Sequence, residues 1–182
     1  MLVWLGLLWL LEAVDYATGH ALDTFGVEPR RAGELIDVFP SAFTHFGFEH
    51  LAANSVPLFV LGFLAALRGG VLRFLGAALV IMATAGLGVW LIAPAGSNTA
   101  GASGVVFGLF GFLLIRGFLD REPLDIGIGV LVAAGYGSIL WGVLPTAEGV
   151  SWQGHLFGLI GGVLAAFLYR ERRAPAASRL TR

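Results

Sequence analysis

Residues 101–115 read GASGVVFGLFGFLLI, which places Ser103 where a charge-free loop enters a strongly apolar helix. A second apolar helix is predicted to begin at about Trp152, and His155 lies near its start. A histidine is the usual activator of a serine nucleophile. The two residues, at corresponding depths of a hydrophobic bundle, therefore suggest a nucleophile and its base inside a membrane.

The composition excludes an ordinary soluble domain. Of the 182 residues, 57% are hydrophobic and only 13% are charged, which is too little polar surface to cover a globule of this size. The net charge of −1 argues against nucleic acid as a partner. The chain has no cysteine, which excludes disulfides, iron–sulfur clusters and thiol catalysis.

Six membrane-spanning helices account for the apolar segments. Each span needs about 20 mostly apolar residues, so six use roughly 120 and leave short loops and tails. The predicted helices cover approximately residues 2–18, 49–67, 71–92, 103–118, 124–143 and 152–169. The sequence thus predicts an all-α, polytopic membrane helix bundle over residues 1–170. Residues 171–182 are expected to form a basic, disordered cytoplasmic tail.

The arginines orient this bundle. With six spans, nine of the eleven arginines fall on one side of the membrane and only Arg30 and Arg31 on the other. Because basic residues concentrate on the cytoplasmic side, both termini are expected in the cytoplasm. Ser103, His50 and His155 then lie near the outer, extracytoplasmic ends of their helices.

His50 and Asn54 form a polar face on the second helix. They are four residues apart and therefore project about 40° apart around the helix axis. Polar side chains are costly in a bilayer and usually face the bundle interior or water. The pair could make interhelical hydrogen bonds or donate to a developing oxyanion, and these two residues alone leave both interpretations open.

The small residues around Ser103 also have two interpretations. Gly104, Gly108 and Gly111 are typical of close helix packing. They would also leave the serine hydroxyl uncrowded, and the first helical turn offers free backbone N–H groups that can hold negative charge.

His155 is followed by a similar glycine pattern. Gly158 and Gly162 have the G-xxx-G spacing that permits tight helix packing. If the fourth and sixth helices cross through their glycine faces, the Ser103 hydroxyl and the His155 ring come within reach. A lone histidine could instead be a structural bond or a proton relay, but together with Ser103 and the His50/Asn54 face it favours catalysis. The second, fourth and sixth helices offer no buried aspartate as a third member, so a dyad is the economical inference.

Other chemistries fit the sequence poorly. His45 and Glu49-His50 hint at a metal, but the H-E-x-x-H pattern is absent, and no metal or nucleotide cofactor is expected. A pair of facing intramembrane aspartates is also missing. Glu12 and Asp15 in the first helix could suggest ion transport, although their place near its outer end more often indicates a solvated rim or a bond into the first loop.

Three segments resemble the motifs of the rhomboid family of intramembrane serine proteases. They are His45-Phe-Gly-Phe-Glu-His50-Leu-Ala-Ala-Asn54, Gly101-Ala-Ser103-Gly104 and Gly154-His155-Leu-Phe-Gly158-Leu-Ile-Gly-Gly162. They occur in the family's order and spacing over about residues 24–170, and the six-span bundle matches the family's basic fold.

The resemblance implies a function and a site. Ser103 would be the nucleophile and His155 the general base and later acid. His50, Asn54 and the Ser103 backbone N–H would stabilise the oxyanion. The substrates would be single-span membrane proteins, cut near the outer surface of the cell (inner) membrane, with lateral entry near Trp141 and Trp152. The alternative is a non-proteolytic rhomboid-like protein that binds membrane clients.

Two positions depart from the family pattern. Many bacterial relatives carry a Trp-Arg pair in the first loop, where this chain has Ile36-Asp37. A tyrosine often follows the nucleophile by four residues and stacks beneath the histidine, and here that residue is Phe107. Since Phe107 keeps the stacking face and neither change removes an essential group, activity is expected.

Overall fold

The computed structural model describes residues 1–145 and 149–170, and the regular secondary structure in these ranges is entirely helical, without a regular strand. The predicted tail, residues 171–182, lies outside the described residues. The α-helices are α1 (Leu2–Ala17), α2 (Phe48–Gly69), α3 (Val71–Ile92), α4 (Ser103–Asp120), α5 (Pro123–Tyr136) and α6 (Trp152–Leu168). Short 3₁₀ helices form η1 (Ala21–Phe25), η2 (Ala32–Val38), η3 (Pro40–Ala42) and η4 (Gly137–Val143). The all-α bundle is confirmed, and five of the six predicted helices are present with ends that shift by a few residues; the fifth differs, as described below.

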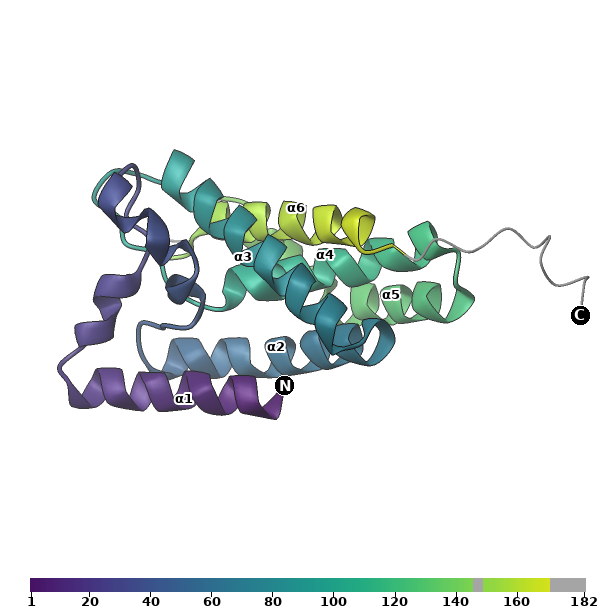
Figure 1. Ribbon diagram of the computed structural model, residues 1–182, viewed down its shortest axis with the longest axis horizontal. Coiled ribbons are helices and arrows are strands. Elements are labelled where there is room, and N and C mark those ends of the chain that lie inside the picture. The colour runs from purple at the N-terminus through teal and green to yellow at the C-terminus, as the bar shows by residue number, and fades with distance from the viewer. Residues whose placement is uncertain (146–148, 171–182) are drawn as a thin grey trace, which may run out of the picture.

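The helices run alternately up and down (Figure 1). The first loop, with η1 to η3, and the loop between α3 and α4 lie at one end of the bundle, at the left of the view. The start of α1 and the end of α6 point toward the opposite end. Four segments of the described chain are long and apolar enough to cross a membrane: α2, α3, α4 and α5 continued through η4. Helix α6 is a shorter apolar helix of 17 residues, and α1 has 16.

The fifth predicted helix is not one continuous α-helix. It is α-helical to Tyr136 and continues as the tighter 3₁₀ helix η4. Gly135 and Gly137 flank this change, and glycine is about 1 kcal/mol less favourable than alanine in a helix interior. Such mid-helix 3₁₀ segments often occur at functional places, and η4 contributes directly to the site described below.

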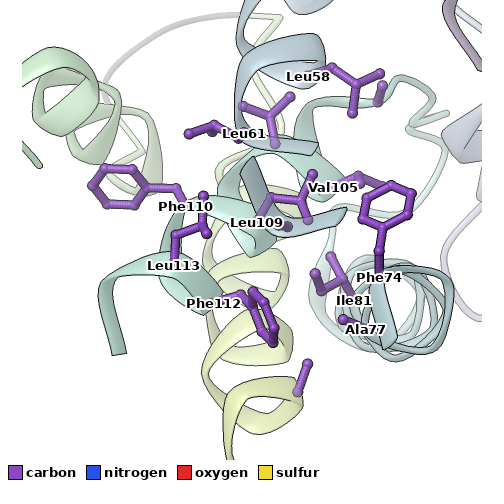
Figure 2. Packing of buried hydrophobic residues seen from close by; sticks show 14 of the residues in the cluster. Leu58, Leu61, Phe74, Ala77, Ile81, Val105, Leu109, Phe110, Phe112 and Leu113 are labelled. Atoms are coloured by element: carbon purple, nitrogen blue, oxygen red, sulfur yellow. The ribbon is translucent and has the colours of Figure 1, made fainter. Parts of the chain in front are cut away.

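Helix α4 forms the centre of the bundle. Its side chains are buried on almost every side, which explains why it is apolar all round instead of having one polar face. Figure 2 shows its Val105 and Leu109 packed between residues of α2 and residues of α3. Leu58 and Leu61 come from α2, and Phe74, Ala77 and Ile81 from α3.

Helices α4 and α6 cross with their backbones in direct contact. A Cβ on Gly108 would lie 2.8 Å from the carbonyl oxygen of Gly158, and a Cβ on Gly158 would lie 2.9 Å from the carbonyl carbon of Gly104. One turn further, a Cβ on Gly162 would collide with the carbonyl of Gly108. The predicted crossing through glycine faces is confirmed, and it brings the first turns of α4 and α6 together.

The two acidic residues of α1 are buried and do not form a solvated rim. The Asp15 carboxylate accepts a hydrogen bond from the Leu22 backbone N–H at 2.7 Å and pairs with His20 Nδ1 at 2.9 Å. Asp15 therefore bonds into the first loop, which was one of the two interpretations above. Glu12 is equally buried, and neither of its carboxylate oxygens has a hydrogen-bond partner.

The first loop and the loop between α3 and α4 are joined by backbone hydrogen bonds. The N–H of Val27 donates to the Thr99 carbonyl at 2.8 Å, and the N–H of Thr99 donates back to Val27 at 3.2 Å. Gly101, two residues before α4, donates its N–H to the Ser41 carbonyl at 2.8 Å. The first loop thus holds the segment that leads into Ser103.

Candidate functional site

A cavity of about 760 Å³ opens among α2, α4, α6, η4 and the loop segments that precede α4 and α6. The four side chains that the sequence singled out all line it: His50, Asn54, Ser103 and His155. They come from three different helices, and only the tertiary structure brings them to one space.

Ser103 is the first residue of α4. The N–H groups of a first helical turn have no partner within the helix, so they face whatever occupies the space beyond it. Gly101 has a φ of +129° and a Cβ there would lie 2.7 Å from His50 Cε1. Glycine is therefore required at this position for two reasons: its backbone conformation and the close approach of the His50 ring.

The His155 ring is held in one orientation. Its Nδ1 lies 2.9 Å from the carbonyl oxygen of Gly142 in η4. A carbonyl only accepts, so Nδ1 carries the proton and donates it, which leaves Nε2 with a free lone pair. The Phe107 ring stacks on the imidazole with 4.0 Å between ring centroids and 7° between planes. The ring is therefore fixed by a bond at one edge and by a flat contact on one face.

The helix that carries His155 is capped by a serine. The Ser151 hydroxyl accepts a hydrogen bond from the Gly154 N–H at 3.3 Å, which satisfies one of the free donors of the first turn of α6. Ser103 and His155 are not hydrogen-bonded to each other in the described structure. Such bonds are often long in a free enzyme and tighten when substrate binds.

His50 and Asn54 lie side by side on the wall formed by α2. The Asn54 side-chain amide donates one hydrogen to the His50 carbonyl at 3.0 Å, which orients it and leaves its second N–H available. The His50 ring meets the His45 ring edge to face, with 5.1 Å between centroids. Both candidate donors are thus positioned by contacts with α2 and with His45, which precedes it.

His45 is a residue whose part in the site the sequence did not predict. It is 1% exposed, and its Nε2 accepts the backbone N–H of Ala102 at 3.1 Å. Burial, with a smaller effect of neighbouring His50, lowers the pKa of His45 to about 4, so the ring is neutral and can accept this bond at pH 7. His45 therefore holds the residue that precedes Ser103. The two bonded residues are 57 positions apart in the sequence, so no local pattern could have indicated this hydrogen bond.

Gly142 and Gln153 are two further residues that sequence reasoning missed. The Gly142 contribution is a backbone carbonyl, which any residue type supplies, so the sequence holds no signal for it. Gln153 is 6% exposed and lines the cavity two positions before His155. A polar residue in the first turn of an apolar helix could have been noticed there.

Among the described residues, one cluster places possible metal ligands close together: Asp15, His20 and Asp23. It does not line the cavity. The Asp15 carboxylate in this cluster is already bonded to His20 Nδ1 and to the Leu22 backbone N–H. We therefore interpret the cluster as a structural contact that joins α1 to the first loop.

The structure shows where the residues that depart from the rhomboid motifs lie. Phe107 supplies the stacking face that was expected of it. Ile36 is 74% exposed on η2, whereas its neighbour Asp37 is buried. Trp141 of η4 is 73% exposed, so the outer surface of η4 presents a large apolar side chain beside the cavity wall.

Comparison with known proteins adds a family assignment to this geometry. The Rhomboid domain family matches residues 32–172. The uncharacterized protein Rv1337 of Mycobacterium tuberculosis is 42% identical over 98% of this chain and 78% of its own length. The uncharacterized protein ML1171 of Mycobacterium leprae is 40% identical over 92% of this chain and 69% of its own. Rhomboid protease GluP of Bacillus subtilis is 31% identical over 67% of this chain, which corresponds to 24% of GluP.

The matched region includes the four candidate site residues, His50, Asn54, Ser103 and His155, and five of the six α-helices. This chain therefore belongs to the rhomboid family of polytopic membrane proteins.

Proposed function

We propose that this protein is an intramembrane serine endopeptidase with Ser103 as nucleophile and His155 as general base. The observation that carries the proposal is the convergence of Ser103, His155, His50 and Asn54 on one cavity. The reaction needs no metal or nucleotide, because all its proton transfers run between these side chains, the substrate and water.

In the first half of the reaction, His155 Nε2 takes the proton of the Ser103 hydroxyl while Oγ attacks the carbonyl carbon of the scissile bond. The carbonyl oxygen becomes an oxyanion. His50, the free N–H of Asn54 and the Ser103 backbone N–H stabilise it. The imidazolium then gives its proton to the leaving nitrogen, the C–N bond breaks, and an acyl-enzyme on Ser103 remains.

In the second half, His155 removes a proton from a water molecule that attacks the acyl carbon. The intermediate collapses, the proton on His155 returns to Ser103 Oγ, and the new carboxyl end of the substrate leaves. Only the Ser103 ester and the substrate peptide bond are broken, so no oxidant or co-reactant is required.

The Gly142 carbonyl takes the place of an orienting carboxylate. Its bond to Nδ1 keeps Nε2 basic and directed toward the cavity, and its dipole stabilises the imidazolium that forms. Phe107 restricts the ring from the other side. This arrangement supports a dyad, as the sequence suggested, with a backbone group in the supporting position.

The substrates we propose are single-span proteins of the cell membrane. The cavity is lined by the start of α4, the start of α6 and the loop between α3 and α4, which lies at the end of the bundle that carries η1 to η3 (Figure 1). The arginine bias favours an extracytoplasmic position for that end, with both termini in the cytoplasm. A transmembrane helix must unwind locally at this level to present a peptide bond to Ser103. The exposed outer surface of η4 near Trp141 is the proposed side of entry.

The test is cleavage of a fluorogenic single-span substrate by purified protein, comparing wild type, Ser103→Ala and Ser138→Ala. Ser138 is an exposed serine of η4 that does not line the cavity, so it serves as the matched control. Loss of essentially all turnover in Ser103→Ala alone, together with labelling of Ser103 by a fluorophosphonate, would support the proposal. Equal cleavage by Ser103→Ala would overturn it, and a folded wild type that neither cleaves nor is labelled would favour a client-binding protein.

A further inference from the structure

Gln153 is placed to contact whatever fills the cavity. It is the second residue of α6, it lines the same cavity as Ser103 and His155, and it is 94% shielded from solvent by the rest of the protein.

The Gln153 amide has no partner in the fold. Its side chain forms no hydrogen bond and no ion pair in the described part of the chain. The capping task at the start of α6 is performed by Ser151, so Gln153 is not needed for it. The residue as a whole is buried, yet its amide atoms are not among the sealed, unpaired polar atoms of the described structure, so the amide is open to the cavity and can bond to what enters it.

Three of the other polar side chains that line the cavity form hydrogen bonds within the protein. Asn98 donates to the Asp23 carbonyl at 2.8 Å, and Ser97 donates to the Pro94 carbonyl at 2.8 Å. Asn54 donates one N–H to the His50 carbonyl. Gln153 differs from them because both its donors and its acceptor are uncommitted.

The chemistry of an unwound peptide complements this amide. When a helix opens, the N–H and C=O groups of its backbone lose their partners, and in a membrane no bulk water replaces them. A glutamine side chain offers an N–H donor and a C=O acceptor in one plane, which matches the N–H and C=O of a main chain. Being neutral, it makes no demand on the charge of the substrate side chains.

We propose that Gln153 is a substrate-binding residue that pairs with one main-chain peptide group of the substrate, unwound beside Ser103. This inference rests on the proposed protease function. It explains why a polar residue stands in the first turn of α6, and it predicts recognition of an unwound backbone largely independent of side-chain sequence.

The experiment combines enzyme and substrate changes. The enzyme variants are Gln153→Met, which keeps the length of the side chain and removes its hydrogen bonds, and Gln153→Glu, which keeps an acceptor and removes the donors. The substrates carry a single backbone ester, placed in turn at each of several positions around the scissile bond. An ester removes one N–H and weakens one carbonyl acceptor without changing any side chain.

With the unmodified substrate, Gln153→Met is expected to lower kcat/KM about tenfold, with Ser138→Ala unchanged. For wild type, the ester at one substrate position should reduce kcat/KM relative to the unmodified substrate. For Gln153→Met, the same ester should cause little further reduction, because the hydrogen bond is already absent. Equal ester sensitivity of both enzymes at every position would overturn the proposal, as would a Gln153→Met variant that cleaves like wild type.

A separate readout distinguishes this inference from the protease proposal. The rate of Ser103 labelling by a small fluorophosphonate, which has no peptide backbone, should be the same in wild type and Gln153→Met. A parallel loss of labelling and cleavage would show that Gln153 acts on the folding of the site and not on the substrate. Absence of both in wild type would overturn the protease function itself.

Discussion

The Phe107 ring lies flat against the His155 imidazole, with 4.0 Å between centroids and 7° between planes. Phe107 projects from the second turn of α4 and His155 from the first turn of α6, so this contact exists only because the two helices cross closely. The Phe107 ring restricts one face of the His155 imidazole, and the Gly142 carbonyl holds its Nδ1 through a hydrogen bond.

Loss of this stacking should slow the reaction more than it weakens the fold. Aromatic pairs are worth about 0.5–1.5 kcal/mol beyond their buried area, so Phe107→Leu is expected to lower kcat about threefold to tenfold with little change in KM. Phe110→Leu is the matched control, because Phe110 is a buried phenylalanine of the same helix that does not line the cavity. It should lower the free energy of unfolding by about 1 kcal/mol and leave kcat unchanged. Equal kcat losses in the two variants would contradict the role of Phe107.

A side chain at position 142 should disturb the His155 ring directly. A Cβ there would lie 3.0 Å from His155 Nδ1 and 2.8 Å from Phe107 Cζ. Gly142→Ala is therefore expected to reduce kcat at least about tenfold, equivalent to about 1.4 kcal/mol, and to shift the ¹⁵N resonances of His155 away from the Nδ1–H tautomer. Gly137→Ala in the same 3₁₀ helix meets nothing within 4 Å and should behave as wild type. An unchanged tautomer and full activity in Gly142→Ala would show that this contact is dispensable.

The crossing of α4 and α6 should tolerate no extra methyl group. Because a Cβ on Gly162 would collide with the Gly108 carbonyl, Gly162→Ala must push the helices apart, at a cost of about 1–3 kcal/mol. Thermal or denaturant unfolding in a fixed detergent measures this loss. Gly127→Ala on α5 meets nothing within 4 Å, and alanine is the better helix former by up to about 1 kcal/mol, so it should be neutral or slightly stabilising. A Gly162→Ala protein as stable as Gly127→Ala would be inconsistent with the packing described.

His45 should make stability depend on pH. Its pKa of about 4 in the folded protein lies below the 6.5 of an unfolded histidine, so between these values the unfolded chain binds more protons. The stabilisation is complete above pH 6.5 and is lost as the pH falls toward 4. When the pH is lowered from 7.5 to 5, the titration of His45 should reduce the free energy of unfolding by about 2 kcal/mol.

The measurement for His45 is the free energy of unfolding at pH 7.5 and pH 5 for wild type and His45→Asn. Asparagine retains an acceptor for the Ala102 N–H and does not titrate. The wild type should lose about 2 kcal/mol more than the variant over this range. Since His50 and the other histidines are present in both proteins, their contributions cancel. Identical losses would mean that His45 is not the titrating group.

The sequence by itself determined the six helices, their order and the residues that could carry chemistry. Apolar runs such as 71–92 leave a chain little choice in a bilayer, because only a helix satisfies every backbone group within the segment. Ser103, His155, His50 and Asn54 stood out because polar side chains at helix ends are costly in such runs. The break at Tyr136 was not predicted, since two glycines weaken a helix without specifying what replaces it.

Only the tertiary structure decided how these residues are supported. The hydrogen bonds from His155 Nδ1 to the Gly142 carbonyl and from the Ala102 N–H to His45 depend on which backbone groups lie beside the two rings after packing. The position of the Gln153 amide in the cavity depends on packing in the same way. A carbonyl or an N–H belongs to every residue type, so its use leaves no mark in the local sequence. Residue types set the helices and the candidate groups, and the close approach of α4 to α6 through their glycines set the geometry in which those groups meet.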